Sequence, residues 1–412
     1  MPTKPGSPAH NEPSASRRKF LRGAAAGTAA AAAIPIFAMA AEKAPEKAPA
    51  KAPEPAKPAA PAVVSSTGAQ SMRWQSTWPA KDIFHEYALD FAKKVNDMTG
   101  GDLRIEVLPA GAVVPAFQLL DAVTKGALDG GHGVLVYHYG KQNALALWGS
   151  GPGFGMDANM LLSWHKYGGG KELLAKLYAS IGANVVSFPY GPMPTQPLGW
   201  FKKPITKAED MKGLKFRTVG LSIDVFTAMG VAVNALPGGE IVPAMDRGLL
   251  DAAEFNNATS DRILGFPDVS KVCMLQSFHQ NAEQFEIMFN KPKYDALPAK
   301  MKAIIDNAVE AASADMSWKA VHRYSQDYLE MQQKQNVKFY KTPDSILQRQ
   351  LTAYDAAAVK RKDNALWVEI ETSQKRFAER AVKWDLDTNV NRSMAYRHYF
   401  AKSGTKPAPK KA

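Results

Sequence analysis

The sequence has only one cysteine, Cys273, so it can form neither an internal disulfide nor a metal cluster held by thiolates. Cys273 lies in the apolar run 272–275, a setting typical of a small buried side chain rather than of a reactive thiol. The eight histidines show no spacing typical of metal ligands. Sequence patterns for thiolate or histidine metal sites are therefore absent.

Catalytic motifs are also lacking. The segment 220–224 has no second glycine, which a nucleophile elbow requires. The segment 168–172 lacks the upstream glycine and the following Ser or Thr of a phosphate-binding loop. The glycine-rich segment 149–155 contains Pro152 and no helix start, which is typical of a flexible connection. We therefore predict a protein that is not an enzyme.

Net positive charge is small outside the two ends of the chain. The formal net charge is +12, but residues 1–70 and 402–412 together carry nine of these charges. The body of the chain is nearly neutral, which excludes the basic surface of a nucleic-acid-binding protein.

The amino terminus has the features of a twin-arginine signal peptide. Arg17 and Arg18 precede an Ala-rich apolar stretch that ends in 38–40, Ala-Met-Ala. A basic surface helix would not explain why this apolar stretch ends there. We predict a signal peptide over 1–40 and export to the periplasm. Residues 41–70 are mostly Ala, Pro, Lys and Glu and predict a disordered linker, and 403–412 predict a basic disordered tail. Further along, no run of about 18 apolar residues predicts a membrane span.

An internal repeat predicts two similar α/β lobes. Residues 108–116 resemble 236–244, and residues 122–129 resemble 244–251. Each copy has the pattern strand, helix, strand, helix, strand, which indicates mostly parallel sheets covered by helices. The expected strands are 72–76, 103–108 and 130–136 in the first copy, and 214–218, 232–236 and 252–256 in the second.

The predicted fold is a two-lobed, periplasmic-binding-protein-like clamp with a ligand cleft at the carboxyl ends of the strands. We place the first lobe at 71–195 and the second at 196–290. Residues 299–342 and 344–403 contain neither Gly nor Pro, so 291–402 is expected to form long helices. These helices would pack across both lobes or against a partner subunit, as in a homodimer.

Two residues at predicted strand ends carry the chemistry of a binding site. Arg217 could hold a carboxylate through two parallel hydrogen bonds. Glu254 follows an apolar strand, and a buried acid must be paired or bind a cation. Two interpretations remain open: a cation between Glu254 and an anionic ligand, or an Arg217–Glu254 ion pair. The repeat also places His132 and Glu254 at equivalent strand ends, so both are expected to face the cleft; the alternative for His132 is a satisfied core or loop histidine.

Several sequence strings resemble a known family. They are Gly-Trp-Phe at 199–201, Asp-Met-Lys-Gly-Leu-Lys-Phe-Arg at 210–217, Met-Phe-Asn-Lys at 288–291 and Trp-His-Lys-Tyr-Gly-Gly-Gly at 164–170. From about residue 72 to 400 the chain resembles the extracytoplasmic solute receptors of tripartite ATP-independent periplasmic (TRAP) transporters. It is most similar to the members that bind 2-oxo or 2-hydroxy monocarboxylates together with a metal ion.

The resemblance implies a cation, Na⁺ or Ca²⁺, held by Gln196, Glu254 and the backbone carbonyl of Phe255. It implies that Arg217 binds the ligand carboxylate and that the aromatic strand 136–139 lines the pocket. It also implies delivery of the ligand to a small and a large membrane subunit. The expected ligand-binding residues are Arg217, Gln196, Glu254, Tyr137, Trp78, Asn257 and His279.

The chain departs from the family pattern at two places. Residues 278–283 replace a Trp- and Gly-rich pocket segment, and Asn256-Asn257 replace a turn that contains Gly or Pro.

Two other functions would use the same cleft. One is a secreted metal-dependent enzyme with Glu254 as base and His132 as acid. The other is the ligand-binding module of a chemoreceptor or scaffold.

Overall fold

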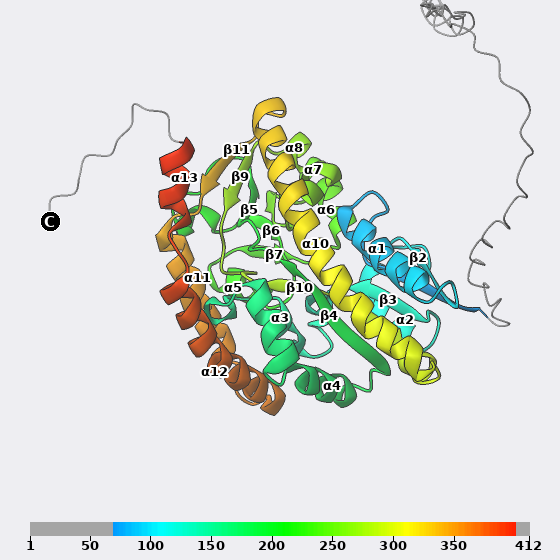
Figure 1. The fold of residues 1–412 in the computed structure, drawn as a ribbon. Helices are drawn as coiled ribbons and strands as arrows, with labels where there is room; N and C mark the ends of the chain where they lie inside the picture. The colour runs from blue at the N-terminus through cyan, green and yellow to red at the C-terminus, as the bar shows by residue number, and fades with distance from the viewer. Residues whose placement is uncertain (1–68, 401–412) are drawn as a thin grey trace, which may run out of the picture. The chain divides into compact units, whose positions relative to one another are not determined.

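The computed structural model describes residues 69–400, which form two β-sheets with helices packed on them (Figure 1). These residues belong to a single structural unit. The predicted signal peptide (1–40), the tail (403–412) and the linker (41–70), apart from its last two residues, lie outside the described residues. None of the described helices is both long and apolar enough to cross a membrane.

The first sheet has the strand order β2-β1-β3-β10-β4. Strand β1 pairs in parallel with β2 and β3, whereas β10 runs antiparallel to both β3 and β4. We call this sheet with helices α1 to α4 the first lobe. Its elements are β1 (Gln70–Ser76), α1 (Ile83–Met98), β2 (Leu103–Leu108), α2 (Leu119–Thr124), β3 (Gly130–Gly133), α3 (Ala158–Tyr167), α4 (Gly170–Ser180), β4 (Val185–Met193) and β10 (Glu283–Asn290).

The second sheet has the strand order β11-β9-β5-β8-β6-β7, and we call it with helices α5 to α8 the second lobe. Its elements are β5 (Gly199–Phe201), β6 (Lys215–Arg217), α5 (Ser222–Ala228), β7 (Ala232–Asn234), α6 (Gly238–Asp246), β8 (Ala252–Ala253), α7 (Ala258–Leu264), α8 (Phe266–Val269), β9 (Val272–Leu275) and β11 (Lys338–Lys341). Both copies of the repeat thus form a strand-helix-strand-helix-strand unit, and the predicted two-lobed α/β fold is confirmed.

Two details differ from the sequence-based prediction. Strand β3 ends at Gly133, and Leu135–His138 form a short 3₁₀ helix, η3, instead of continuing a strand to Tyr139. The turn buries Leu135 and Val136 in different apolar clusters, an outcome that a short apolar run does not reveal. In addition, β10 lies in the first sheet although it falls within the range predicted for the second lobe. The chain therefore crosses between the lobes more often than the repeat alone suggests.

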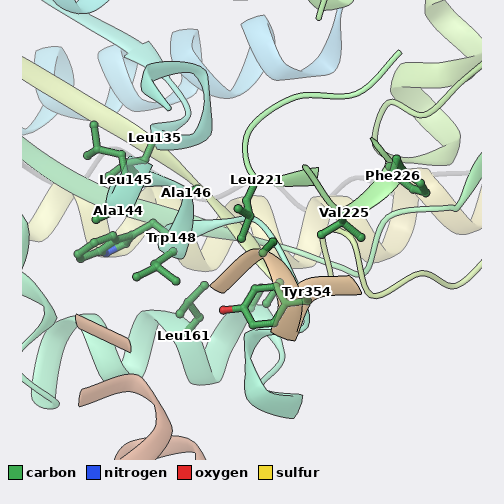
Figure 2. Packing of buried hydrophobic residues seen from close by; sticks show 14 of the residues in the cluster. Leu135, Ala144, Leu145, Ala146, Trp148, Leu161, Leu221, Val225, Phe226 and Tyr354 are labelled. Atoms are coloured by element: carbon green, nitrogen blue, oxygen red, sulfur yellow. The ribbon is translucent and has the colours of Figure 1, made fainter. Parts of the chain in front are cut away.

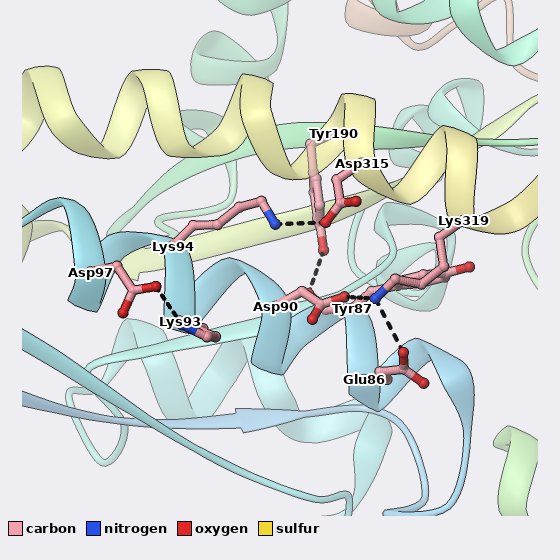
Figure 3. A network of polar contacts seen from close by, with 9 residues as sticks. All are labelled: Glu86, Tyr87, Asp90, Lys93, Lys94, Asp97, Tyr190, Asp315 and Lys319. Atoms are coloured by element: carbon pink, nitrogen blue, oxygen red, sulfur yellow. Dashed lines mark hydrogen bonds and ion pairs between the residues drawn. The ribbon is translucent and has the colours of Figure 1, made fainter. Parts of the chain in front are cut away.

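The long helix α10 (Ala299–Lys334) packs on α1 and β4 of the first lobe and on α7 of the second. Figure 3 shows its contacts with α1: Lys319 pairs with Glu86 and Asp90, and Asp315 pairs with Lys94 at 2.6 Å. On the second lobe, Arg262 lies 2.8 Å from Asp327. Helix α10 therefore connects the two lobes along their length.

Two carboxyl-terminal helices also contact the lobes: α11 (Asp344–Val359) packs on α5 of the second lobe, and α12 (Ala365–Thr388) packs on α3 and α4 of the first. Helix α13 (Arg392–Phe400) follows them and has no buried residue, and a short helix α9 (Lys291–Asp295) precedes α10. Figure 2 shows part of the core beneath them, in which Leu145 and Trp148 of the first-lobe segment η4 (Asn143–Trp148) share a cluster with Val225 and Phe226 of α5 and with Tyr354 of α11. This cluster therefore joins α11 to both lobes.

Candidate functional site

A small pocket of about 20 Å³ lies where the strand ends of the two lobes face each other. This volume holds about one water molecule, so even a ligand of few atoms requires the lobes to move apart. Its walls come from the carboxyl ends of β1, β3, β4, β6 and β8, the edge where open α/β sheets bind ligands. The lining residues are Trp78, Phe84, Val134, Tyr137, Met193, Gln196, Arg217, Val219, Glu254, Phe255, Asn256, Gln280 and Glu283.

Arg217 is the cation of the pocket, and its side chain is only 1% exposed. Its Nε donates to the backbone oxygen of Leu236 at 2.8 Å, and Nη1 donates to Glu254 Oε1 at 2.8 Å. The guanidinium also lies 5.8 Å from the centre of the Phe255 ring. Nη2 has no hydrogen-bond partner within the described residues. A single guanidinium nitrogen, rather than the complete fork expected from the sequence, is thus available to an anion.

Glu254 directly follows β8 and is completely buried. Burial raises the pKa of its carboxyl, and the neighbouring Arg217 charge opposes that rise. The ion pair foreseen as one interpretation is therefore present. The ion pair involves only Oε1 of the Glu254 carboxylate, because Oε2 has no partner among the described residues. The pair and a bound cation are compatible.

Gln196 and Glu283 form a second polar pair on the same pocket. Gln196 Nε2 donates to Glu283 Oε2 at 2.9 Å, which orients the amide and leaves its Oε1 as an acceptor. Burial raises the pKa of Glu283 to about 8, and the Glu254 charge adds to this effect. Both Gln196 and Glu283 are 3% exposed, so water does not compensate their charges and dipoles.

The pocket therefore contains several buried oxygen atoms without a hydrogen-bond donor. They are Gln196 Oε1, Glu254 Oε2, Gln280 Oε1 and Glu283 Oε1. Hard oxygen donors of this kind fit Na⁺ or Ca²⁺ and poorly suit copper or zinc. Residues 69–400 contain no group of three or more His, Cys, Asp or Glu that could hold a metal ion, so a cation here would also need amide, backbone or ligand oxygens. Phe255 also lines the pocket, so the three expected cation ligands are together.

Aromatic residues form another part of the pocket wall. Trp78 and Tyr137 both line the pocket, and their ring centres are 5.8 Å apart. Trp78 Nε1 donates to His132 Nδ1 at 2.8 Å, and His132 Nε2 lies 2.6 Å from the Tyr190 hydroxyl. Burial lowers the pKa of His132 to about 3, which agrees with a neutral imidazole that accepts the tryptophan N–H.

His132 therefore lies behind the aromatic wall, and the expectation that it faces the cleft is wrong. The repeat aligned His132 with Glu254 correctly in sequence, but β3 continues one residue beyond His132, whereas β8 ends before Glu254. The His132 side chain contacts Trp78 and Tyr190 instead of the pocket. It holds Trp78 in place and is not positioned to protonate a ligand.

Two further expected ligand residues do not line this pocket. His279 is buried with its Nδ1 at hydrogen-bond distance from Ser277 Oγ, and its ring packs 5.3 Å from that of Phe226. Asn257 caps α7, where its Oδ1 accepts from the backbone N–H groups of two residues. Neither residue lines the pocket in this structure, although His279 Nε2 has no hydrogen-bond partner among the described residues. The assignment of His279 and Asn257 to ligand binding stays a prediction.

Sequence reasoning missed Glu283, Gln280, Asn256 and Met193. Glu283 begins β10, whereas ligand residues were expected at the carboxyl ends of strands or at positions implied by the family resemblance. Strand β10 runs antiparallel to β3 and β4, so it starts at the edge of the sheet where they end. Its first residue therefore lies at the ligand edge. The departure of residues 278–283 from the family pattern was the one signal that pointed to Glu283 and Gln280.

The chemistry of this arrangement is that of binding. The lining residues supply one guanidinium, amide and carboxylate oxygens, and aromatic surface. The lining set contains no Ser, Cys, Lys or His that could act as a nucleophile with an adjacent base. A small anion and a cation could be held together by these groups.

Comparisons with known proteins agree with this geometry. The family model of bacterial extracellular solute-binding proteins, family 7, matches residues 75–361. A monocarboxylate 2-oxoacid-binding periplasmic protein of Nostoc is 37% identical over 251 residues, which is 60% of this chain and 68% of that protein.

Two solved structures are similar in fold and sequence. A TRAP transporter solute-binding protein from Bordetella bronchiseptica, with copurified calcium and picolinate, is 26% identical with a TM-score of 0.75 and covers 81% of this chain and 97% of its own. One from Pseudoalteromonas atlantica, with bound sodium and pyruvate, is 28% identical with a TM-score of 0.73 and covers 80% of this chain and 99% of its own. This chain belongs to family 7 of the bacterial extracellular solute-binding proteins, and the prediction of a binding protein rather than an enzyme is confirmed.

Proposed function

We propose that this protein captures a small 2-oxo or 2-hydroxy monocarboxylate together with Na⁺ or Ca²⁺ and delivers it to the membrane subunits of a TRAP transporter. The observation that carries the proposal is the pairing of one unpartnered guanidinium nitrogen, Arg217 Nη2, with unpartnered oxygens in a buried pocket. An anion would accept a hydrogen bond from Arg217 Nη2, and a cation would be coordinated by the unpartnered oxygens. The relatives that bind pyruvate or picolinate with sodium or calcium support the same pairing.

Each group has a distinct part in binding. Arg217 Nη2 donates to the ligand carboxylate, and Glu254, Gln196 and the Phe255 carbonyl hold the cation. When bound, the cation offsets the negative charges of Glu254 and of the ligand, which would otherwise repel each other in a dry pocket. Trp78 and Tyr137 cover the carbon skeleton and exclude water.

The two lobes touch around the pocket, so a ligand can enter or leave only when they separate. The rings of Phe84 in the first lobe and Phe255 in the second are 5.8 Å apart. On another side of the cleft, the Tyr139 hydroxyl donates to Asp224 of α5 at 2.6 Å. These contacts support a clamp that opens to load its ligand and closes over it.

Ligand recovery distinguishes a binding protein from the enzyme alternative. Protein purified from its host is analysed by native mass spectrometry with elemental analysis, and is also incubated for a long period with pyruvate and Ca²⁺. The proposal predicts a small acid and a cation in the purified protein, and pyruvate recovered unchanged. Conversion of pyruvate would instead support the metal-dependent enzyme.

Two other parts of the proposal concern export and assembly. The Arg17-Arg18 pair supports export by the twin-arginine pathway.

Exposed apolar side chains on the carboxyl-terminal helices support a homodimer through these helices. They are Trp384, Leu386, Met394, Tyr396, Tyr399 and Phe400. Light scattering that gives the mass of a single chain at micromolar concentration would contradict the dimer.

A further inference from the structure

The pocket contains a second carboxylate that the resemblance to the family did not imply. Glu283 lies on the same pocket as Glu254, is 3% exposed, and has a single hydrogen bond from a described residue, the one from Gln196 Nε2. Its Oε1 has no partner among residues 69–400. A buried carboxylate with a free oxygen requires a positive partner, and Arg217 is already paired with Glu254.

The surroundings of Glu283 hold its side chain in place. A Cβ on Gly149 would lie 2.8 Å from Glu283 Cγ and 3.0 Å from its Oε1, so only a glycine at 149 leaves room for this side chain. From the other side, the backbone N–H of Gln196 donates to the carbonyl of Gln280 at 3.3 Å. This bond ties the segment before Glu283 to the segment that carries the expected cation ligand. The Glu283 side chain is therefore held in a fixed, buried position and does not extend into solvent.

Formal charges indicate which cation the pocket needs. A cation at Glu254 and Gln196 would favour the ionised form of the neighbouring Glu283. In that form Arg217, Glu254 and Glu283 sum to −1, and a bound monocarboxylate brings the sum to −2. Na⁺ would leave one uncompensated negative charge in a buried site, whereas a divalent cation leaves none. Ca²⁺ also takes 6–8 oxygen ligands, and Glu283 Oε1 adds one to the expected set.

We propose that Glu283 is a further cation ligand and that it makes the site prefer Ca²⁺ over Na⁺. This inference rests on the proposed function, since it assumes that a cation and a carboxylate bind together. It goes further by assigning the choice of cation to one residue.

The test compares wild-type protein with Glu283→Gln and, as control, Glu240→Gln, which removes an exposed charge on α6 away from the pocket. Each protein is stripped of metal and titrated with Ca²⁺ or Na⁺ at constant ionic strength, with and without pyruvate. Thermal unfolding and calorimetry give the cation affinities. Glu283→Gln should weaken Ca²⁺ binding by about tenfold or more and change Na⁺ binding by less than about threefold. Glu240→Gln should match wild type.

A second variant separates charge from shape. Glu283→Asp keeps the charge on a shorter side chain, so it should retain a preference for Ca²⁺ that Glu283→Gln loses. Equal loss of preference in both variants would overturn the inference, as would an unchanged ratio of Ca²⁺ to Na⁺ affinity in Glu283→Gln. If neither cation alters pyruvate binding to the wild type, the proposed function itself fails. If a cation is required but its identity does not depend on residue 283, only this inference fails.

Discussion

Arg217 Nη1 lies 2.8 Å from Glu254 Oε1, and both side chains are almost completely buried. Removing two charges from water costs several kcal/mol each, and such pairs often contribute little net stability. Here each member also keeps one atom without a described partner, Nη2 on the arginine and Oε2 on the glutamate. The pair can therefore bind an anion and a cation side by side without being broken.

Arg217→Lys should weaken pyruvate binding by about tenfold or more, equivalent to about 1.4 kcal/mol. Lysine keeps the charge but cannot donate to Leu236, Glu254 and a ligand from one rigid plane. The control is Arg262→Lys, in an ion pair between α7 and α10 away from the pocket, which should leave the affinity unchanged. Calorimetry that gives equal affinities for Arg217→Lys and wild type would place Arg217 outside the site.

His279→Asn should change the pH dependence of stability and leave pyruvate affinity within about twofold. Burial lowers the pKa of His279 from 6.5 to about 3 in the folded protein. Between these values the unfolded chain binds the proton and the folded chain does not, so the free energy of unfolding decreases as the pH falls below 6.5. The contribution of this histidine is about 1.4 kcal/mol per pH unit, and the variant should lack it.

Urea unfolding at pH 7, 6 and 5 measures this difference. His322→Asn, which changes an exposed histidine of α10, is the control and should follow wild type. The same pH slope in His279→Asn as in wild type would contradict the prediction. A large loss of pyruvate affinity would place His279 in the ligand site.

Arg17→Lys combined with Arg18→Lys should leave the precursor in the cytoplasm, because the paired arginines are the feature that the twin-arginine machinery reads. Cell fractionation followed by immunoblotting measures the periplasmic yield. Arg22→Lys, which changes a nearby arginine outside the pair, should be exported normally. Unchanged periplasmic yield of the double variant would refute this route of export.

The repeat allowed the fold to be predicted from the sequence. Its two copies share apolar strands and the glycines that end helices, and the spacing of these features depends on local structure. Arg217 and Glu254 were found because each lies at or just after the carboxyl end of a strand, whereas Tyr137 and Trp78 were expected from the resemblance to the family. What local pattern cannot provide is the pairing of distant segments. The position of β10 between β3 and β4 joins residues 90 or more apart in the chain, and this pairing brings Glu283 to the pocket.

The direction of individual side chains also could not be predicted from the sequence. His132 and His279 lie close to the site, but one hydrogen bond in each case turns the imidazole toward Trp78 or Ser277. Such bonds depend on packing between segments, which no spacing encodes.

The most direct measurement is calorimetric titration of pyruvate into metal-stripped protein, with and without saturating Ca²⁺. If cation and carboxylate share the site, each strengthens the binding of the other by the same factor. Pyruvate should therefore bind at least about tenfold more tightly with Ca²⁺. Glu254→Gln, which deletes the charge and keeps the shape, should abolish most of that difference. Equal pyruvate affinity with Ca²⁺ and in calcium- and sodium-free buffer would contradict the account and leave Arg217 and Glu254 as a structural ion pair.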